Sequence, residues 1–390
     1  MGKTLRRERT TEVHSTQRTA VVVAPWAGVH RLGPRLSSEA VTARSAQTHS
    51  TPRAAHRLLD PIQVMRLPSR ILSRPLRISL IAALVPLLAV GAALMPKNTA
   101  HAEGAEADKA ELNERCAVRL SIALLNKSAE PKELTSNDPQ AAVDSMVASR
   151  EFAEHFARFT NAHFNAAPTE HVDQDPVYAL AKYVIVEQKP WADLFVGPYS
   201  FAVSGSQLEV KADPNGLGYF RYEPWLVRYA GNEDQGYLLS ASFRLLQNTI
   251  DLELIPSVGV AGEDNSATGR QRSPCNGCHF DAWYALDKIA RLLPRKKLEG
   301  EQVKMQPTTD GPQELLNKTV KDDKELVTSL VQSESWRFAQ CRNVFHFLYG
   351  RAENQCESKV FDACVTALEE KKTIQSAVAA VAKDPSFCRN

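Results

Sequence analysis

One short segment combines two thiols and an imidazole at a spacing that suits a specific chemistry: Cys275-Asn-Gly-Cys278-His279. Two cysteines three positions apart can reach the two vinyl groups of one haem and form thioethers with them. The histidine that follows is then held beneath the iron and supplies an axial nitrogen. This is the attachment pattern of c-type haem. The motif predicts one covalent haem c per chain, with Cys275 and Cys278 as attachment residues and His279 as proximal iron ligand.

A Cys-x-x-Cys pair also occurs in redox disulfides and in zinc sites. A zinc ribbon needs a second pair of ligands at similar spacing, and the chain has no second CxxC and no CxxH. A thioredoxin-like site needs a preceding strand in a βαβ unit, and no such pattern comes before Cys275. The single CxxCH also excludes a dihaem peroxidase or a multihaem wire built from this chain alone.

The sixth iron ligand decides the class of function. Methionine is typical of electron transfer, whereas an open position allows ligand binding or redox catalysis. Met305 is the favoured distal ligand, because it falls in an expected loop 26 residues after His279. Met146 lies on an expected apolar helix face and is more typical of a core residue. His163 and His346 are further candidates, each also explained by helix packing.

The elements around the motif are expected to be helical. Phe280, Trp283 and the apolar residues up to Leu293 recur every three or four positions, and Pro294 ends the pattern. This spacing predicts one helix face on which Phe280 and Trp283 pack near the porphyrin ring. Further apolar stripes predict more helices within residues 275–390, with a loop at Lys304-Met-Gln-Pro307 between two of them. The same period predicts helices over residues 103–166, with one starting near Pro139 and running past His163, and over residues 176–188.

Residues 197–256 have a different pattern. Two alternating runs, Leu208–Ala212 and Tyr219–Glu223, flank the turn-forming segment Asp213-Pro-Asn-Gly216. This arrangement predicts a β-hairpin between the two runs. Residues 237–243 fit a strand or a short helix, and residues 257–274 have the composition of a loop.

The N-terminal part has the features of an export signal. An apolar run of about 18 residues, Ile78–Met95, follows four arginines and precedes the cleavage pattern Ala100-His101-Ala102. A basic region, an apolar core and small residues at the cut site predict a signal peptide, with an uncleaved anchor as the alternative. Residues 1–64 carry ten basic side chains. We expect Met65 to be the true start, and the alternative is a disordered basic arm that binds nucleic acid or anionic lipid.

The net charge of +2 is an average over two unlike parts. Residues 1–102 contain 15 basic and 4 acidic side chains, and residues 103–390 contain 32 basic and 41 acidic ones, a balance of −9. The basic excess therefore belongs to the export segment, and no nucleic-acid partner is expected for the remainder. An acidic chain favours a redox partner that is basic or that uses local patches.

Five further cysteines are Cys116, Cys341, Cys356, Cys364 and Cys388. Export favours disulfides, and the odd number leaves at least one thiol unpaired. Four of the five lie near the C-terminus, which predicts one or two local bridges with unassigned connectivity. If residues 356–364 were all helical, Cys356 and Cys364 would be about 12 Å apart, too far for a disulfide. Cys116 and Cys341 lie on apolar helix faces, where a buried thiol is the simpler interpretation.

Several segments together resemble the planctomycete-type cytochrome proteins, large exported bacterial chains with a c-type haem motif. The similar segments lie between residues 115 and 390; the most specific are the segment ending in Cys275-Asn-Gly-Cys278-His279 and the segment ending in Tyr349-Gly-Arg351. The resemblance implies a helical N-terminal module, a haem module and a helical C-terminal module. It implies no particular reaction.

The predicted fold is mainly α with a small β-hairpin region and a cytochrome c-like helical haem domain at the C-terminal end. The predicted parts are a basic extension (1–64), a signal peptide (65–102), a helical N-terminal module (103–190), a mixed α/β segment and loop (191–270), and a c-type haem and helical C-terminal module (271–390). The predicted function is one-electron transfer with a periplasmic redox partner, in the periplasm or outside the cell. A membrane is involved only if the signal stays uncleaved. The alternatives are a haem-dependent enzyme or enzyme subunit with an open iron position, and a haem-containing binding or sensor module.

Overall fold

The computed structural model describes residues 99–165, 171–231, 233–254 and 264–389, with side chains from residue 108 onward. The chain divides into two compact units, Met1–Ala89 and Val90–Asn390, and all described residues belong to the second unit. The predicted extension and most of the predicted signal peptide lie outside the described residues. Within the described part, no helix is both long and apolar enough to cross a membrane.

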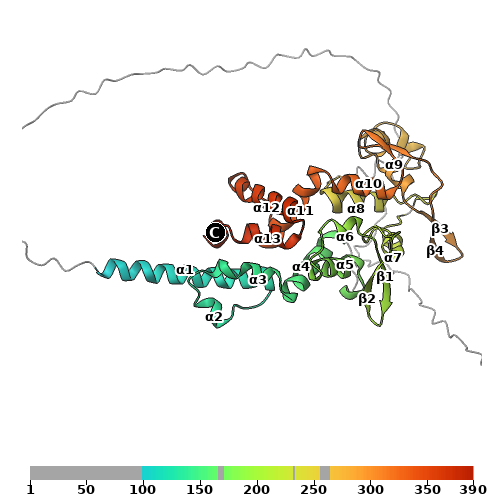
Figure 1. Ribbon diagram of the computed structural model, residues 1–390. Helices are drawn as coiled ribbons and strands as arrows, with labels where there is room; N and C mark the ends of the chain where they lie inside the picture. Colours follow the sequence, from blue (N-terminus) through green and yellow to red (C-terminus); the bar gives the residue numbers. More distant parts are fainter. Residues whose placement is uncertain (1–98, 166–170, 232, 255–263, 390) are drawn as a thin grey trace, which may run out of the picture. The chain divides into compact units, whose positions relative to one another are not determined.

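The second unit is mainly helical, with small antiparallel sheets of two strands, as the sequence predicts (Figure 1). The α-helices are α1 (Thr99–Leu125), α2 (Pro131–Leu134), α3 (Val143–Val147), α4 (Arg150–Phe164), α5 (Pro176–Val186), α6 (Asp193–Val196), α7 (Glu223–Arg228), α8 (Leu239–Ile250), α9 (Leu286–Leu292), α10 (Asp323–Val331), α11 (Glu334–Tyr349), α12 (Ser358–Lys371), α13 (Ile374–Ala382) and α14 (Pro385–Arg389). The shorter helical turns are η1 (Pro139–Ala142), η2 (Val172–Gln174), η3 (Gly269–Gln271), η4 (Gly277–Asp281) and η5 (Gln355–Glu357).

Hydroxyl and carboxylate side chains cap the N-termini of several of these helices. Ser149 Oγ accepts a hydrogen bond from the Phe152 amide at the start of α4, and Ser333 Oγ does the same for the Trp336 amide at the start of α11. Such caps satisfy amide groups that have no partner inside the helix. The cap at Ser149 also explains a correction: the single helix expected from Pro139 past His163 is divided into η1, α3 and α4.

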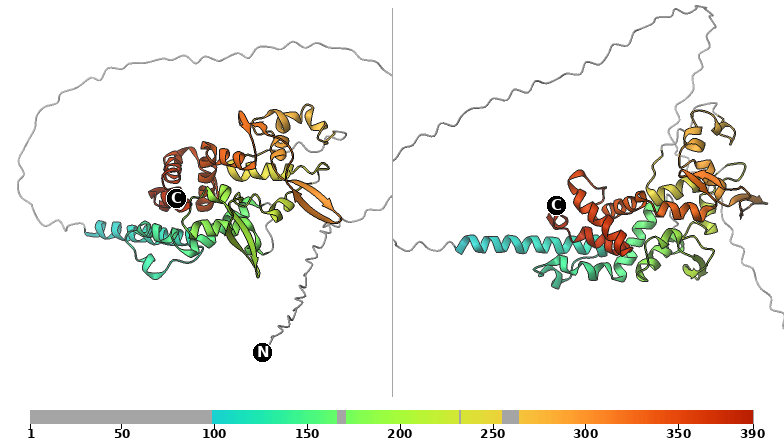
Figure 2. Two further views of the ribbon diagram at one scale, coloured as in Figure 1. Left: turned by 45° about the vertical axis from the view of Figure 1, so that its right-hand side comes forward. Right: turned by 45° about the horizontal axis from the view of Figure 1, so that its top comes forward.

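The strands form three hairpins, two of which are labelled on both strands in Figure 1 and can be followed in Figure 2. Their strands are β1 (Tyr199–Ser204) with β2 (Gln207–Ala212), β3 (Arg295–Glu299) with β4 (Gln302–Gln306), and β5 (Gln313–Leu315) with β6 (Lys318–Val320). Residues 295–320, which include the loop expected around Met305 between two helices, instead form the strands β3 to β6. Each of these strands has an adjacent partner in sequence, so a short two-residue turn suffices to form it.

The predicted partner of the strand at Leu208–Ala212 is also wrong. This segment belongs to β2, and β2 pairs with the preceding β1 through a turn at Gly205, whose φ of 61° suits glycine. The expected second strand does not form, because Tyr219 and Phe220 are 0% and 3% exposed and pack in the core. Residues 237–243, which fitted a strand or a helix, lead into and begin α8.

The core is built from aromatic and aliphatic side chains of α4, α5, α8, α11 and the segments between them. Phe156 and Trp191 contact each other edge to face, with ring centroids 5.7 Å apart. Trp191 Nε1 donates a hydrogen bond to Gln340 Oε1 at 2.9 Å, which links α11 to a residue 149 positions earlier. Large buried aromatic side chains contribute most to such a core.

Hydrogen bonds cross the predicted boundaries at residues 190 and 270. Gln140 Nε2 donates to Ala382 O at 2.8 Å, and Gln375 Nε2 donates to Ile185 O at 2.8 Å. The N-terminal helices therefore pack directly against the C-terminal ones. The module boundaries stay predictions.

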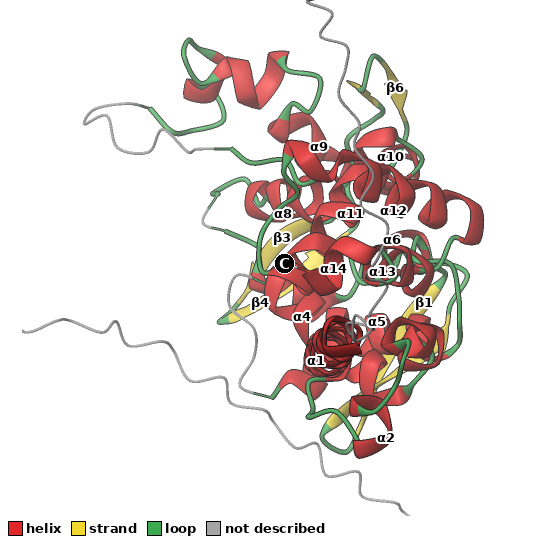
Figure 3. Cartoon of the chain, turned by 90° about the vertical axis from the view of Figure 1, so that its left-hand side faces the viewer, coloured by secondary structure: helices red, strands yellow, loops and turns green. Residues whose placement is uncertain are grey.

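Two disulfides connect described helices. Cys116 on α1 is bonded to Cys388 on α14, and Figure 3 shows these two helices side by side. Cys341 on α11 is bonded to Cys364 on α12, which is the local C-terminal bridge that the sequence predicts. Cys116 and Cys341 are thus buried in disulfides, and their interpretation as buried thiols is wrong. Cys356 is an exposed free thiol.

Candidate functional site

The CxxCH segment forms a single helical turn. The His279 amide donates to Cys275 O at 3.2 Å, and the Ala282 amide donates to Gly277 O at 2.9 Å, five residues back. Bonds of the second type define a π-helical turn, which is uncommon and is frequently found at functional sites. The two bonds together span Cys275 to Ala282, so this turn holds both cysteines and His279.

Both thiols of the motif are unbridged. Cys275 is half-buried and Cys278 is exposed, and no disulfide joins them. The sheets of the described residues are two-stranded and antiparallel, so these residues contain none of the parallel βαβ structure that a thioredoxin-like site requires. The same residues contain no group of three His, Cys, Asp or Glu side chains placed to hold a metal ion.

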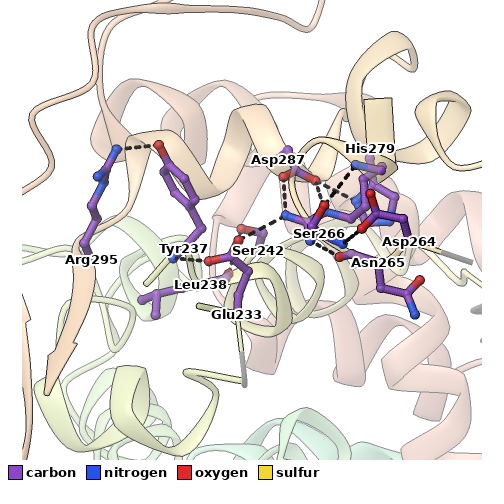
Figure 4. A network of polar contacts seen from close by, with 12 residues as sticks. Glu233, Tyr237, Leu238, Ser242, Asp264, Asn265, Ser266, His279, Asp287 and Arg295 are labelled. Carbon is purple, nitrogen blue, oxygen red and sulfur yellow. Dashed lines mark hydrogen bonds and ion pairs between the residues drawn. The ribbon is translucent and has the colours of Figure 1, made fainter. Parts of the chain in front are cut away.

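A buried carboxylate orients His279. Its Nδ1 atom lies 2.7 Å from Oδ2 of Asp287, which is in the first turn of α9 and is 2% exposed (Figure 4). Burial alone would raise the pKa of Asp287, but hydrogen bonds from His279 and Arg270 outweigh it and lower the pKa below its usual value. An ionised carboxylate only accepts hydrogen bonds, so Nδ1 carries the proton. The Nε2 atom is the ring nitrogen that does not face Asp287.

Arg270, on η3, holds Asp287 from the other side. Its Nη2 and Nε atoms lie 2.7 Å from Oδ1 and 3.1 Å from Oδ2 of the carboxylate, and the arginine is 6% exposed. Arg270 Nη2 also lies 3.4 Å from Glu233 Oε1, and Glu233 Oε2 accepts from the Tyr237 amide at 3.2 Å. Figure 4 shows this network extending from His279 and Asp287 to Glu233 and Tyr237.

Close packing of the backbone before η3 fixes the position of Arg270. A Cβ atom on Gly269 would lie 1.7 Å from the carbonyl oxygen of Asp264, so only glycine fits beside that residue. Asp264 Oδ1 accepts from the Ser266 amide at 3.0 Å, and Arg270 Nη1 donates to Asn265 O at 2.6 Å. The loop before η3 therefore fixes the arginine through both its backbone and its side chain.

Phe280 and Trp283 do not share one continuous helix face, which corrects the prediction. The π-helical turn ends at Asp281, Ala282 is extended with ψ of 157°, and α9 begins only at Leu286. Phe280 is half-buried, and Trp283 is 45% exposed. Both residues remain close in the chain to His279. Trp283 also lines a surface hollow of about 240 Å³ together with Ile250, Leu316 and Leu330.

Tyr284 contacts the attachment segment directly. Its hydroxyl donates to Cys278 Sγ at 3.5 Å, and this hydrogen bond, with burial, raises the pKa of Tyr284 to about 12. Sequence reasoning did not single out Tyr284, Asp287, Arg270 or Glu233. An acidic residue eight positions after the motif histidine was the only available signal for Asp287. Nothing in the spacing pointed to Arg270 or Glu233, which come from earlier segments.

Met305 lies on β4 opposite Lys296, not in a loop between helices, which corrects the prediction. Its amide donates to Glu223 Oε1 at 3.3 Å, and its side chain is partly buried against the core. The main neighbours of β4 are β3 and α7, whereas those of η4 are α9 and η3. Among the described contacts, the structure brings Cys275, Cys278, His279 and Phe280 together but does not bring Met305 to them.

The remaining ligand candidates lie on other elements. Met146 is 5% exposed on α3, and its prediction as a core residue is confirmed. His163 on α4 and His346 on α11 face each other with ring centroids 6.1 Å apart. His163 also contacts Phe159 and Phe164 of its own helix and is hydrogen-bonded to the Asn343 side chain of α11, and none of these partners belongs to η4.

The residues of the motif fit a covalently held haem. A Cβ atom on Gly277, between the two cysteines, would meet nothing within 4 Å, so there is open space beside the turn. The exposed Cys278 and Trp283 offer a thiol and an apolar ring that a flat macrocycle would cover. The chain matches no protein-family model, no curated protein and no solved structure.

Proposed function

We propose that this chain is an exported monohaem c-type cytochrome that transfers single electrons. Cys275 and Cys278 form the thioethers, and His279 supplies Nε2 as the proximal ligand. The observation that carries the proposal is the 2.7 Å contact between His279 Nδ1 and Asp287, beside two unbridged thiols. Metal-bound histidines usually donate the other ring N–H to a carboxylate, a carbonyl or water.

Each residue of the site has a part in this function. When bound, the haem supplies an iron that cycles between its ferric and ferrous states by one electron. Asp287 fixes the plane and tautomer of His279, so that Nε2 points away from the buried carboxylate. Phe280 and Trp283 pack against the ring, and Trp283 loses part of its exposure on doing so. Haem attachment to this segment also agrees with the resemblance to the planctomycete-type cytochromes.

Export is the second part of the proposal. The signal peptide predicted at residues 65–102 delivers the chain to the periplasm or beyond, where covalent haem attachment takes place. Two disulfides, Cys116–Cys388 and Cys341–Cys364, fit an oxidising compartment. The acidic balance of residues 103–390 suits a redox partner protein with a basic docking surface.

The absorption spectrum of the oxidised holoprotein tests the proposal and the distal ligand together. The chain is to be produced in a host that attaches haem in its periplasm. We expect a c-type spectrum and, if Met305 is the sixth ligand, the weak far-red band of His/Met ligation. Met305→Ala should then abolish this band, whereas Met146→Leu should keep it. A wild-type protein without covalent haem would overturn the proposal.

A second candidate function is supported by the position of Met305. The described contacts of β4 are with β3 and α7, so the sixth iron position could be open to a small ligand or substrate. In that case the chain is a haem-dependent enzyme, an enzyme subunit or a sensor. A high-spin spectrum that shifts on addition of cyanide, and that is unchanged in Met305→Ala, would select this candidate over electron transfer.

A further inference from the structure

His279 is linked to a chain of buried side chains whose charges alternate in sign. Asp287 contacts the imidazole, Arg270 contacts Asp287, and Glu233 contacts Arg270. The side chains of Asp287, Arg270 and Glu233 are 3%, 7% and 9% exposed. Three charged side chains are rarely buried together without a structural or functional reason. They come from three separate segments, so neither local helix formation nor capping accounts for them.

We propose that Asp287, held by Arg270 and Glu233, is a positioning residue that keeps the reduction potential of the haem iron low. This inference rests on the proposed function and adds to it the electrostatic control of the same site. It assigns a role to residues that do not themselves touch the haem.

The geometry leaves Asp287 no freedom to turn. Oδ1 accepts from Arg270 Nη2 at 2.7 Å, and Oδ2 is shared by Arg270 Nε at 3.1 Å and His279 Nδ1 at 2.7 Å. A paired guanidinium and carboxylate of this kind form two near-parallel hydrogen bonds and fix each other's orientation. The hydrogen bond to His279 is therefore held by a rigid acceptor, not by a mobile surface carboxylate.

The sign of the effect follows from the charges. A carboxylate that accepts a hydrogen bond from Nδ1–H makes the imidazole a stronger electron donor, and this favours ferric over ferrous iron. Asp287 and Glu233 carry two negative charges against the one positive charge of Arg270, which leaves an excess negative charge behind the histidine. Charges in such a poorly solvated place act more strongly than charges in water. Reduction adds one electron to the iron without making or breaking a bond, so the excess charge opposes it directly.

Arg270 moderates this effect as well as fixing the geometry. Its positive charge lies against Asp287 and limits the electron density that the carboxylate passes to His279. Glu233 contacts Arg270 but not His279, and its negative charge partly offsets the positive charge of Arg270. Glu233 therefore also lowers the reduction potential. The expected order of influence on the potential is therefore Asp287 first and Glu233 second.

The test is a potentiometric titration of the holoprotein and of single variants. Asp287→Asn removes the charge and keeps the size, and we expect at least a tenfold gain in the equilibrium constant for reduction, an upward shift of about 59 mV for one electron. Glu233→Gln should shift the potential upward by less. Asp281→Asn is the matched control, because this carboxylate is exposed in the same turn and bonds to Asn276, not to His279. Its shift should be the smallest, because solvent screens exposed charges.

The outcomes separate this inference from the proposed function. A wild-type chain without covalent haem overturns the function itself. Haem attached to every variant, with Asp287→Asn shifting the potential downward or no more than Asp281→Asn, overturns only the inference. If Asp287→Asn gives no folded holoprotein, Glu233→Gln decides: an upward shift larger than that of Asp281→Asn supports the inference, and an equal or smaller shift overturns it.

Discussion

Cys116 and Cys388 are joined by a disulfide across 272 positions of sequence, so the first described helix is bonded to the last one. The two cysteines are on α1 and α14, which lie side by side (Figure 3). Arg119, one turn after Cys116, stacks over the ring of Phe387 at 4.5 Å from its centroid. The bond thus closes a contact that side-chain packing also makes.

Removing this disulfide should destabilise the protein. A crosslink stabilises mainly by restricting the unfolded chain, and native disulfides contribute typically about 2–4 kcal/mol. We expect the double variant Cys116→Ser, Cys388→Ser to lower the free energy of unfolding by that amount in urea titrations. Cys356→Ser is the control, because Cys356 is an exposed free thiol, and it should change the free energy by less than about 0.5 kcal/mol. Equal effects of the two changes would contradict the assigned pairing.

The N-cap of α11 should have a measurable contribution to stability. Ser333 Oγ accepts from the Trp336 amide at 3.2 Å, and replacing such a cap by alanine costs about 1 kcal/mol. Ser333→Ala should therefore lower the free energy of unfolding by about 1 kcal/mol. Ser335→Ala, an exposed position two residues into the same helix, should leave it unchanged or raise it slightly, because alanine has the higher helix propensity. A loss at Ser335 as large as that at Ser333 would rule out capping as the cause.

Acidification should weaken the ion pairs of α4. Burial would raise the pKa of Glu154, but hydrogen bonds from Lys182 at 2.7 Å and Arg158 at 2.6 Å lower it from 4.5 to about 2. A depressed pKa in the folded state gives stability that is present above pH 4.5 and is lost as the pH falls toward 2. The side chain is 38% exposed, so screening limits the contribution to about 1 kcal/mol.

The measurement is the free energy of unfolding of wild type and Glu154→Gln at several pH values. The variant should be less stable at pH 7, and the difference should shrink as the pH falls below about 4.5. Glu369→Gln is the control, since this exposed residue of α12 has no ion pair in the part of the chain that the structure describes. A difference at Glu154 that grows on acidification would contradict the assigned direction of the pKa.

Local patterns predicted the helices well where one apolar face is buried. The helical period over residues 176–188 corresponds to α5, and the helices expected within residues 275–390 include α11, which ends at Gly350 with φ of 70°. The hairpins at residues 295–320 were not predicted, because their short strands are largely exposed and carry few apolar residues to show an alternating pattern. The strand expected at Tyr219–Glu223 does not form for the opposite reason, because Tyr219 and Phe220 are buried in the core.

The sequence predicted the attachment residues of the candidate site but not the charged residues around them. The cysteines and His279 are adjacent in the chain, so their spacing alone predicts their chemistry. Asp287, Arg270 and Glu233 are brought together by the packing of α9 against η4 and by the loop before η3, over as many as 54 positions of sequence. A period or a motif carries no information on such contacts. The same limit explains Met305, whose placement depends on β3 and α7 and not on its distance from the motif.

Intact-protein mass spectrometry tests the central claim most directly. The chain and its variants are to be produced in a host that attaches haem in the periplasm and then denatured, so that only covalent groups remain. The account predicts one haem mass on the wild type and on Cys356→Ala, and none on the double variant Cys275→Ala, Cys278→Ala. A wild-type chain without that added mass, or a double variant that retains it, would contradict the account.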